Sequence, residues 1–125
     1  MKEKIRDHSR LEHIQTAINY IFEFAQDKTI EELSTDKMMF FAIVKNIEII
    51  GEAASRLTDD FRQEYNQVPW LYIIKMRHVL VHDYYQISVR EVWKVIHEDL
   101  QPLLDYVSQL IKTVDWKSWE KETDG

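Results

Sequence analysis

The sequence predicts an all-α protein, an up-and-down bundle of four or five helices. Only two Gly and two Pro occur in 125 residues, whereas an all-β fold needs many tight turns. Apolar residues recur at three- and four-residue spacing over long stretches. The length suits one core and is too short for two ordinary domains. We therefore expect one helical domain over residues 1–112 and a tail over 113–125.

The first helix is expected from about Ser9 to Ala25, because several apolar residues share one helical stripe. They are Leu11, Ile14, Ile18, Ile21 and Phe22. The polar segment that follows contains two signals for a helix start. Thr29 and Glu32 have the spacing of a capping box, and Thr35 or Asp36 suits the N-cap of the next helix.

The second helix is expected over about Lys37 to Leu57, and it is apolar on more than one side. A helix of this kind is usually central or buried in a subunit interface, so we expect a homodimer. Gly51 inside it costs about 1 kcal/mol relative to Ala, which suggests close approach by another helix. The residues expected to face a core are Met38, Phe41, Val44, Ile47, Ile50, Ala54 and Leu57, with a second apolar surface at Phe40, Ile43 and Ile49.

The third helix is expected from Trp70 to about His82. It follows a connection over Thr58 to Val68 that contains one short helical turn. Pro69 fits at the helix start, where the missing backbone N–H costs nothing. Residues Asp83 to Ile87 are expected to form a loop.

The fourth helix is expected to begin at a capping box formed by Ser88 and Glu91. Pro102 should kink it, because proline removes a backbone hydrogen bond and crowds the preceding turn. The tail holds Trp116 and Trp119 among charged residues. Three outcomes are open for this tail: it could extend the helix, fray, or dock on a partner.

Composition excludes several functional classes. The absence of Cys excludes disulfides, thiol nucleophiles and Cys-ligated zinc, and it fits a cytoplasmic location. The first residues lack the apolar core of a signal peptide, and no apolar run approaches the roughly 20 residues that span a bilayer, so no membrane partner is expected. A formal net charge of -6 argues against a broad surface for duplex nucleic acid, although it permits a small site for one phosphate.

One segment of this acidic chain concentrates cationic groups. No acidic residue occurs from Gln67 to His82, whereas Lys75, Arg77, His78 and His82 all fall there. Arginine binds phosphate through a bidentate fork, and a histidine poised near neutrality can act as general acid or base. Arg77 and His82 together therefore suit phosphodiester cleavage.

The spacing of these residues leaves their role open. Arg77 and His82 are five apart, which places them about 140° from each other on an ideal helix. The two side chains can reach one substrate group only if the helix unwinds near His82 or if a second subunit supplies the other residue. His78 and His82 share a helix face, and a helix C-terminus favours a charged imidazole. The alternative is that all are ordinary core or surface residues of a bundle helix.

A polar stripe on the second helix offers groups that could act with Arg77. It consists of Lys45, Glu48, Glu52 and Arg56, and the last two are spaced as an i, i+4 ion pair. The stripe is either a solvated face or a means by which Glu52 or Glu48 orients Arg77. We see no carboxylate or His cluster that would hold a metal.

The segment RHVLVHDY runs from Arg77 to Tyr84 and has the pattern R-x-x-x-x-H-x-Y. This pattern resembles the motif of the HepT-like toxins of the HEPN superfamily. KNIEIIGEAASRL from Lys45 to Leu57, VPW from Val68 to Trp70, and VW with DLQPLL between Val92 and Leu104 fit the same family in the same order. In one departure, His78 stands where relatives commonly have Asn or another small polar residue.

This resemblance implies a metal-independent endoribonuclease without a cofactor, whose site forms across a homodimer. His82 would activate the ribose 2′-hydroxyl or protonate the leaving oxygen, and Arg77 would stabilise the charge on the phosphorane-like transition state. His78 is either a spectator or a second acid–base group. RNA is the implied substrate, and DNA should resist because it lacks the 2′-hydroxyl.

The resemblance also implies the toxin of a type VII-like toxin–antitoxin pair. In the family, a cognate MntA-like nucleotidyltransferase antitoxin attaches AMP to the motif tyrosine, which corresponds to Tyr84; the adjacent Tyr85 is the other candidate acceptor. Without the family, Tyr84 is equally well explained as an aromatic plug at a helix end. The implied partners are RNA, a second copy of the chain and this antitoxin, in a complex that can exceed a dimer. Two other classes stay open, a catalytically silent HEPN domain that binds a nucleotide or a neighbouring protein, and a purely structural helical dimer.

Overall fold

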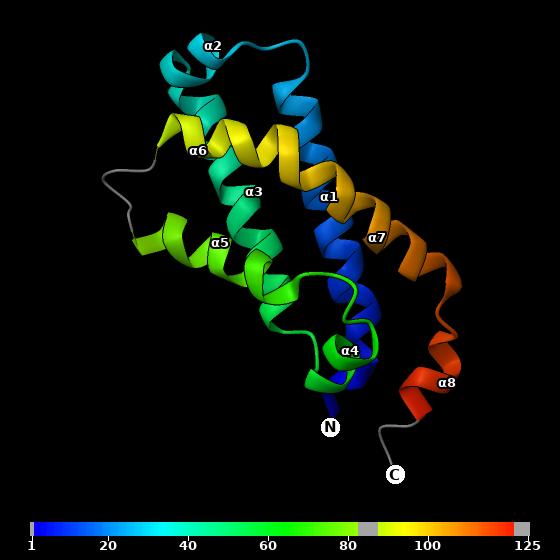
Figure 1. Cartoon of the computed structure of the whole chain (residues 1–125). Coiled ribbons are helices and arrows are strands. Elements are labelled where there is room, and N and C mark those ends of the chain that lie inside the picture. Colours follow the sequence, from blue (N-terminus) through cyan, green and yellow to red (C-terminus); the bar gives the residue numbers. More distant parts are fainter. Residues whose placement is uncertain (1, 83–87, 122–125) are drawn as a thin grey trace.

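The computed structural model describes the backbone of residues 2–82 and 88–121 and the side chains of residues 4–77 and 88–121. Every regular element in these ranges is helical, which confirms the all-α prediction (Figure 1). The long elements are α1 (Asp7–Ala25), α3 (Lys37–Ser55), α5 (Trp70–His82) and a rod made of α6 (Val89–Lys94), the π-helical segment η3 (Val95–Asp99) and α7 (Leu100–Thr113). The short ones are the 3-10 helix η1 (Lys2–Arg6), α2 (Ile30–Thr35), α4 (Asp59–Glu64) and α8 (Trp116–Lys121).

The predicted caps start the helices. The side chain of Thr29 accepts a hydrogen bond from the backbone N–H of Glu32, and the Glu32 carboxylate accepts one from the backbone N–H of Thr29, so the capping box before α2 is confirmed. Asp36, not Thr35, caps α3. Before α6, the side chain of Ser88 accepts a hydrogen bond from the backbone N–H of Glu91, which is the N-cap half of the predicted capping box. The first helix begins two residues earlier than predicted, because η1 leads directly into α1.

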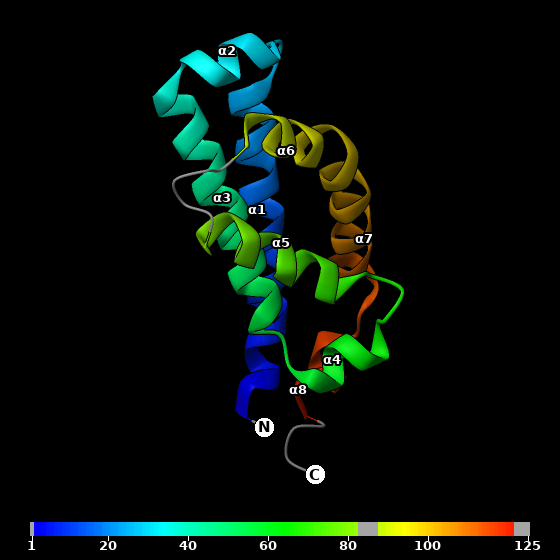
Figure 2. The ribbon, with the colours of Figure 1, turned by 60° about the vertical axis from the view of Figure 1, so that its left-hand side comes forward.

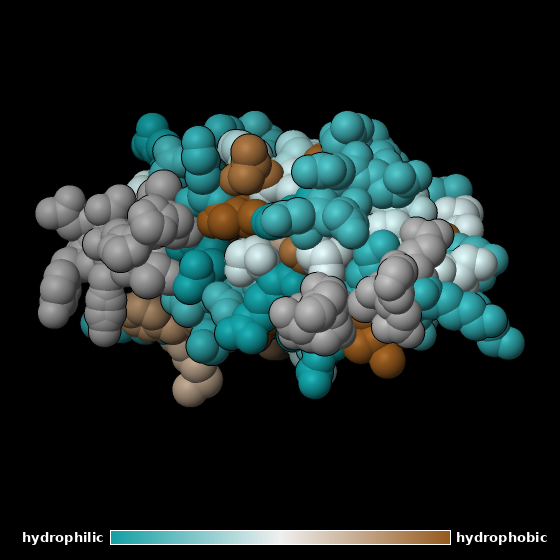
Figure 3. Space-filling view, turned by 90° about the horizontal axis from the view of Figure 1, so that it is seen from below, coloured by the Kyte–Doolittle hydropathy of each residue, from teal (hydrophilic) through white to brown (hydrophobic). Residues whose placement is uncertain are grey.

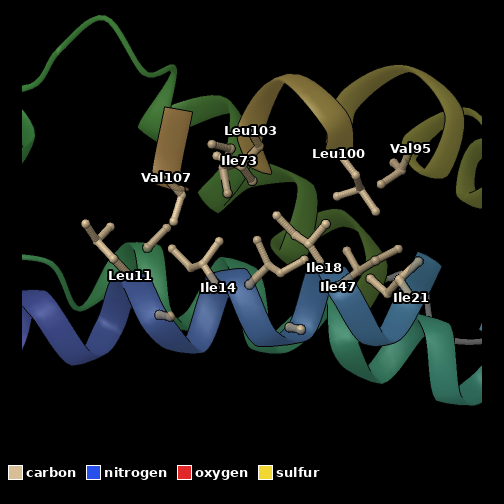
Figure 4. Packing of buried hydrophobic residues seen from close by; sticks show 14 of the residues in the cluster. Leu11, Ile14, Ile18, Ile21, Ile47, Ile73, Val95, Leu100, Leu103 and Val107 are labelled. Carbon is tan, nitrogen blue, oxygen red and sulfur yellow. The ribbon is translucent and has the colours of Figure 1, made fainter. Parts of the chain in front are cut away.

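The central helix of the fold is α3. It packs against α1 on one side and against α5, which crosses it, on the other (Figures 1 and 2). The apolar stripe of α1 faces the other long elements, as the labelled side chains in Figure 4 show. These are Leu11, Ile14, Ile18 and Ile21 from α1, Ile47 from α3, Ile73 from α5, Val95 from η3, and Leu100, Leu103 and Val107 from α7.

The core assignment for α3 was wrong at two positions. Met38 is 84% exposed and Phe41 57% exposed, although both were expected to face the core. Val44, Ile47 and other residues of the predicted stripe are buried. The reason is that α3 carries more apolar surface than α1 and α5 can cover. The uncovered face holds Met38, Phe41 and the partly exposed Ile49.

The rod made of α6, η3 and α7 bends between α6 and α7 (Figures 1 and 2). The bend coincides with η3, where the backbone N–H of Leu100 donates to the carbonyl of Val95 five residues back. Such a π-helical turn is a recognised source of helix kinks, and Pro102 follows just after it. The structure therefore agrees with the predicted kink and places the irregular backbone on the N-terminal side of the proline.

The tail docks on its own bundle. The indole Nε1 of Trp119 in α8 donates to Oδ2 of Asp7, 2.9 Å away, and Asp7 is fully buried. Thr58 donates to both oxygens of the same carboxylate, which therefore joins α1, α4 and α8. Whether the domain proper ends at residue 112 stays a prediction.

The outer surface of this end of the molecule is largely hydrophilic, with separate hydrophobic spots (Figure 3). Among the helices described, none is both long and apolar enough to span a bilayer.

Candidate functional site

Helices α3 and α5 approach each other closely at Gly51. A Cβ atom at this position would lie 2.1 Å from the Cβ of Arg77 and 2.9 Å from its Cγ, so only glycine fits. The close approach expected at Gly51 is therefore confirmed. Its consequence is that the stem of Arg77 rests directly on the backbone of α3.

Glu52 holds the guanidinium of Arg77. Its Oε1 lies 3.2 Å from Nη2 of Arg77, and its Oε2 accepts a hydrogen bond of 2.7 Å from Nε of Arg56. Of the two carboxylates that were expected to orient Arg77, the structure brings Glu52 into contact with it. Glu48 instead pairs with Lys45, at 3.9 Å between Oε1 and Nζ.

The positive charges around Glu52 stabilise its ionised form. The hydrogen bond from Arg56 lowers the pKa of Glu52 below its usual value, and the charges of Arg56, Arg77 and Arg10 act in the same direction, whereas partial desolvation opposes them. Glu52 is therefore a carboxylate at neutral pH. It pairs with one nitrogen of the Arg77 guanidinium, and no other described residue forms an ion pair or hydrogen bond with that group, which has further N–H donors for a ligand.

A cavity of about 400 Å³ opens beside this ion pair. Helices α1, α3 and α5 all contribute to its wall, which is lined by Arg10, His13, Lys45, Glu48, Ile49, Glu52, Ala53, Arg56 and Arg77. Four of these residues are Lys or Arg and two are Glu, in a chain whose formal net charge is -6. The predicted polar stripe of α3 thus borders a cationic cavity, and this cavity suits an anion.

Two residues of this wall were not foreseen from the sequence. Arg10 and His13 come from α1, far from the motif in the chain, and they line the same cavity as Arg77. The sequence did contain one indication that they act together: the two basic residues are three apart, which places them on one helix face. It could not be used without knowing that α1 packs beside α3.

The other predicted site residues lie outside the described side chains. They are His78 and His82, which belong to α5, and Tyr84 with its neighbour Tyr85. No group of three His, Asp or Glu side chains among the described residues is arranged to hold a metal ion.

A family model described as Ribonuclease HepT-like matches residues 14–110. The chain belongs to the ribonuclease HepT-like family. The matched span includes Glu52, Arg77 and the motif run to Tyr84, whereas Arg10 and His13 precede it.

Three archaeal proteins are similar to this HepT-like chain over most of its length. The probable ribonuclease HepT of Thermococcus cleftensis is 36% identical over 112 residues, which cover 90% of this chain and 100% of that protein. The putative RNase MJ1380 of Methanocaldococcus jannaschii is 34% identical over 70% of this chain and 80% of its own length. A third relative from that organism, named gamma-glutamylcyclotransferase and putative RNase MJ0434, is 33% identical over 84% of this chain but only 47% of its own length. No solved structure matches the chain significantly.

Proposed function

We propose that the protein is a metal-independent endoribonuclease in which Arg77 and His82 carry out the cleavage. The observation that carries this proposal is the Arg77 guanidinium, held by Glu52 at the wall of a cationic cavity. The names of the relatives, ribonuclease HepT and putative RNase, support the reaction class.

The chemistry needs only groups of the protein and the RNA. A basic imidazole at His82 takes the proton from a ribose 2′-hydroxyl, and the oxygen attacks the adjacent phosphorus. The bond to the 5′-oxygen breaks, that oxygen takes a proton from the protonated imidazole, and a 2′,3′-cyclic phosphate remains. The donors of Arg77 that Glu52 leaves free stabilise the negative charge that builds up on the phosphoryl oxygens.

A homodimer explains how positions 77 and 82 can act on one phosphate. α5 remains an α-helix to its last residue, His82. Positions five apart on such a helix are separated by about 140°, which favours a site completed by a second subunit. The exposed apolar face of α3, with Met38, Phe41 and Ile49, is a surface that such a partner can cover.

The resemblance of the motif extends the proposal to regulation. We assign the protein to the toxin side of a cytoplasmic toxin–antitoxin pair, with an MntA-like nucleotidyltransferase as the antitoxin. AMP attached to Tyr84, two residues from His82, adds bulk and negative charge beside the reacting phosphate. Such a modification would oppose RNA binding by charge repulsion.

The test is cleavage of a labelled oligoribonucleotide by wild type, His82→Ala and a control, His97→Ala, on η3 away from the cavity. Wild type and control should cut RNA in the presence of EDTA and leave the DNA of the same sequence intact. His82→Ala should be about 10²–10⁴-fold slower, the usual contribution of general acid–base catalysis. Loss of activity in EDTA that magnesium or manganese restores would overturn the scheme.

Two further results separate the alternatives. RNA or nucleotide binding without cleavage would indicate a catalytically silent HEPN domain, and neither binding nor cleavage would indicate a structural role. Light scattering should give a dimer; a monomer near 15.1 kDa at micromolar concentration would contradict the shared site.

A further inference from the structure

The cavity wall contributed by α1 contains an arginine with unused hydrogen-bonding capacity. Nε of Arg10 is buried and has no hydrogen-bond partner within the described part of the chain. Burying an N–H donor without a partner costs about 1–3 kcal/mol, and more for a charged group, so native structures seldom leave one. Because this atom has almost no accessible surface, an acceptor in the cavity reaches it only when the Arg10 side chain turns toward the cavity that it lines.

The carboxylates of the cavity already have partners. Glu52 uses one oxygen for Arg77 and the other for Arg56. Glu48 lies beside Lys45. Arg10 is near enough to Glu52 to lower its pKa, but no ion pair joins the two residues. Among the described residues no carboxylate forms an ion pair with Arg10, so the α1 side of the cavity keeps a positive charge that Glu52 offsets only from a distance.

His13 adds a second hydrogen-bond donor to the α1 side of the cavity. It lies one helical turn from Arg10 on the same face of α1, and both line the cavity that Arg77 also borders. Among the described residues, the wall has no Phe, Tyr or Trp on which a base could stack, and its apolar members are Ile49 and Ala53. The chemistry of this wall therefore suits a phosphate better than a nucleobase.

We propose that Arg10 and His13 form a second phosphate subsite, which binds a backbone phosphate of the RNA next to the phosphate that is cleaved. This inference rests on the proposed ribonuclease function and deepens it. The two residues are positioning residues, because they hold the strand and do not touch the reacting atoms. The subsite makes the enzyme prefer oligonucleotides over a dinucleotide that contains the scissile phosphate alone.

The test compares two substrates with the same scissile step, a dinucleoside monophosphate and a longer oligoribonucleotide. Arg10→Gln should lower kcat/KM for the longer substrate by about 10- to 100-fold, the value of a charge-assisted hydrogen bond. The loss should appear in KM, with kcat unchanged. The dinucleotide should be cleaved within about twofold of the wild-type rate, since it has no phosphate at the subsite. His13→Ala should show the same dependence on substrate length.

Controls separate the subsite from bulk charge and from damage to the fold. Lys112→Gln removes an exposed cation from the end of α7, and His97→Gln alters a histidine on η3; both should leave the length preference intact. Arg10→Lys, which keeps the charge, should restore part of the affinity. Equal losses on both substrates, or no loss on either, would overturn the subsite.

A binding measurement makes failure of the subsite distinguishable from failure of the nuclease proposal. The probe is a 2′-O-methyl oligonucleotide, which has the backbone phosphates but no free nucleophile. Arg10→Gln should weaken its binding and reduce the slope of log K against log salt by about 0.7, as for one single-strand phosphate contact. If wild type binds the probe in this Arg10-dependent way but cuts no RNA, the subsite stands and the nuclease proposal fails. If wild type cuts RNA and the Arg10 variant matches it in every assay, the subsite alone fails.

Discussion

Substitution of Gly51 by alanine tests whether the contact between α3 and α5 positions Arg77. The added Cβ would meet the Cβ of Arg77 at 2.1 Å, while real Cβ contacts essentially never fall below 3.0 Å, so the helices must separate by about 0.9 Å. The Cβ of Arg77 is fixed to its backbone and cannot rotate away. Overpacking of this kind costs about 1–3 kcal/mol, and the better helix propensity of Ala returns about 1 kcal/mol. The net destabilisation should therefore be about 0–2 kcal/mol.

The effect on activity should exceed the effect on stability. A shift of about 1 Å in a group that stabilises the transition state can cost on the order of 10²-fold in rate. The assay is kcat/KM on an oligoribonucleotide together with a thermal melt. The structural control combines Gly51→Ala with Arg77→Gly. This double variant has one Cβ at the contact, as the wild type does, but on α3 instead of α5, and the summed helix propensity of the two positions is nearly unchanged. This double variant should regain stability without regaining activity.

Two outcomes would refute this reasoning about Gly51. Full activity of Gly51→Ala with raised stability would show that the contact between the helices is not tight. A double variant as unstable as Gly51→Ala would show that the clash with Arg77 is not the cause.

Four further predictions concern the site and the tail. Arg77→Lys should recover little of the activity lost in Arg77→Ala, because an ammonium cannot replace a bidentate fork; near wild-type rates would argue for a simple point charge. The cationic neighbours of Glu52 lower its pKa, so the ionised carboxylate stabilises the fold at pH values above the usual pKa range of glutamate. This contribution to stability is lost as the pH falls through the lowered pKa. Thermal melts over the acid range should show this component in wild type and not in Glu52→Gln. Tyr84→Phe should keep RNA cleavage but escape neutralisation by a co-expressed nucleotidyltransferase, and loss of cleavage as complete as in His82→Ala would place the hydroxyl in the catalytic set. Trp119→Phe removes the donor to buried Asp7 and should cost about 1.5–3 kcal/mol of stability with little change in cleavage; an unchanged melting temperature would mean that α8 is not held by this bond.

Local signals in the sequence predicted much of the fold. Thr29, Asp36 and Ser88 act on backbone N–H groups three residues away, so their effect can be read without knowing the rest of the molecule. Gly51 could be interpreted in the same way, because a helix-interior glycine has a local cost that an approaching helix explains. The i, i+4 pair of Glu52 and Arg56 follows from helix geometry alone.

Other features depend on which helix faces are shared, and these were decided by tertiary packing. The sequence of α3 is apolar around most of its surface, so only the positions of α1 and α5 decide that Ile47 is buried while Met38 and Phe41 are exposed. The tail had three open outcomes until Trp119 was found bonded to Asp7, at the opposite end of the chain. Arg10 joins Arg77 at one cavity for the same reason, since α1 and α5 both pack on α3. Interactions between neighbours in sequence are encoded within a few residues, whereas those between distant residues exist only once the faces of several helices have been buried together.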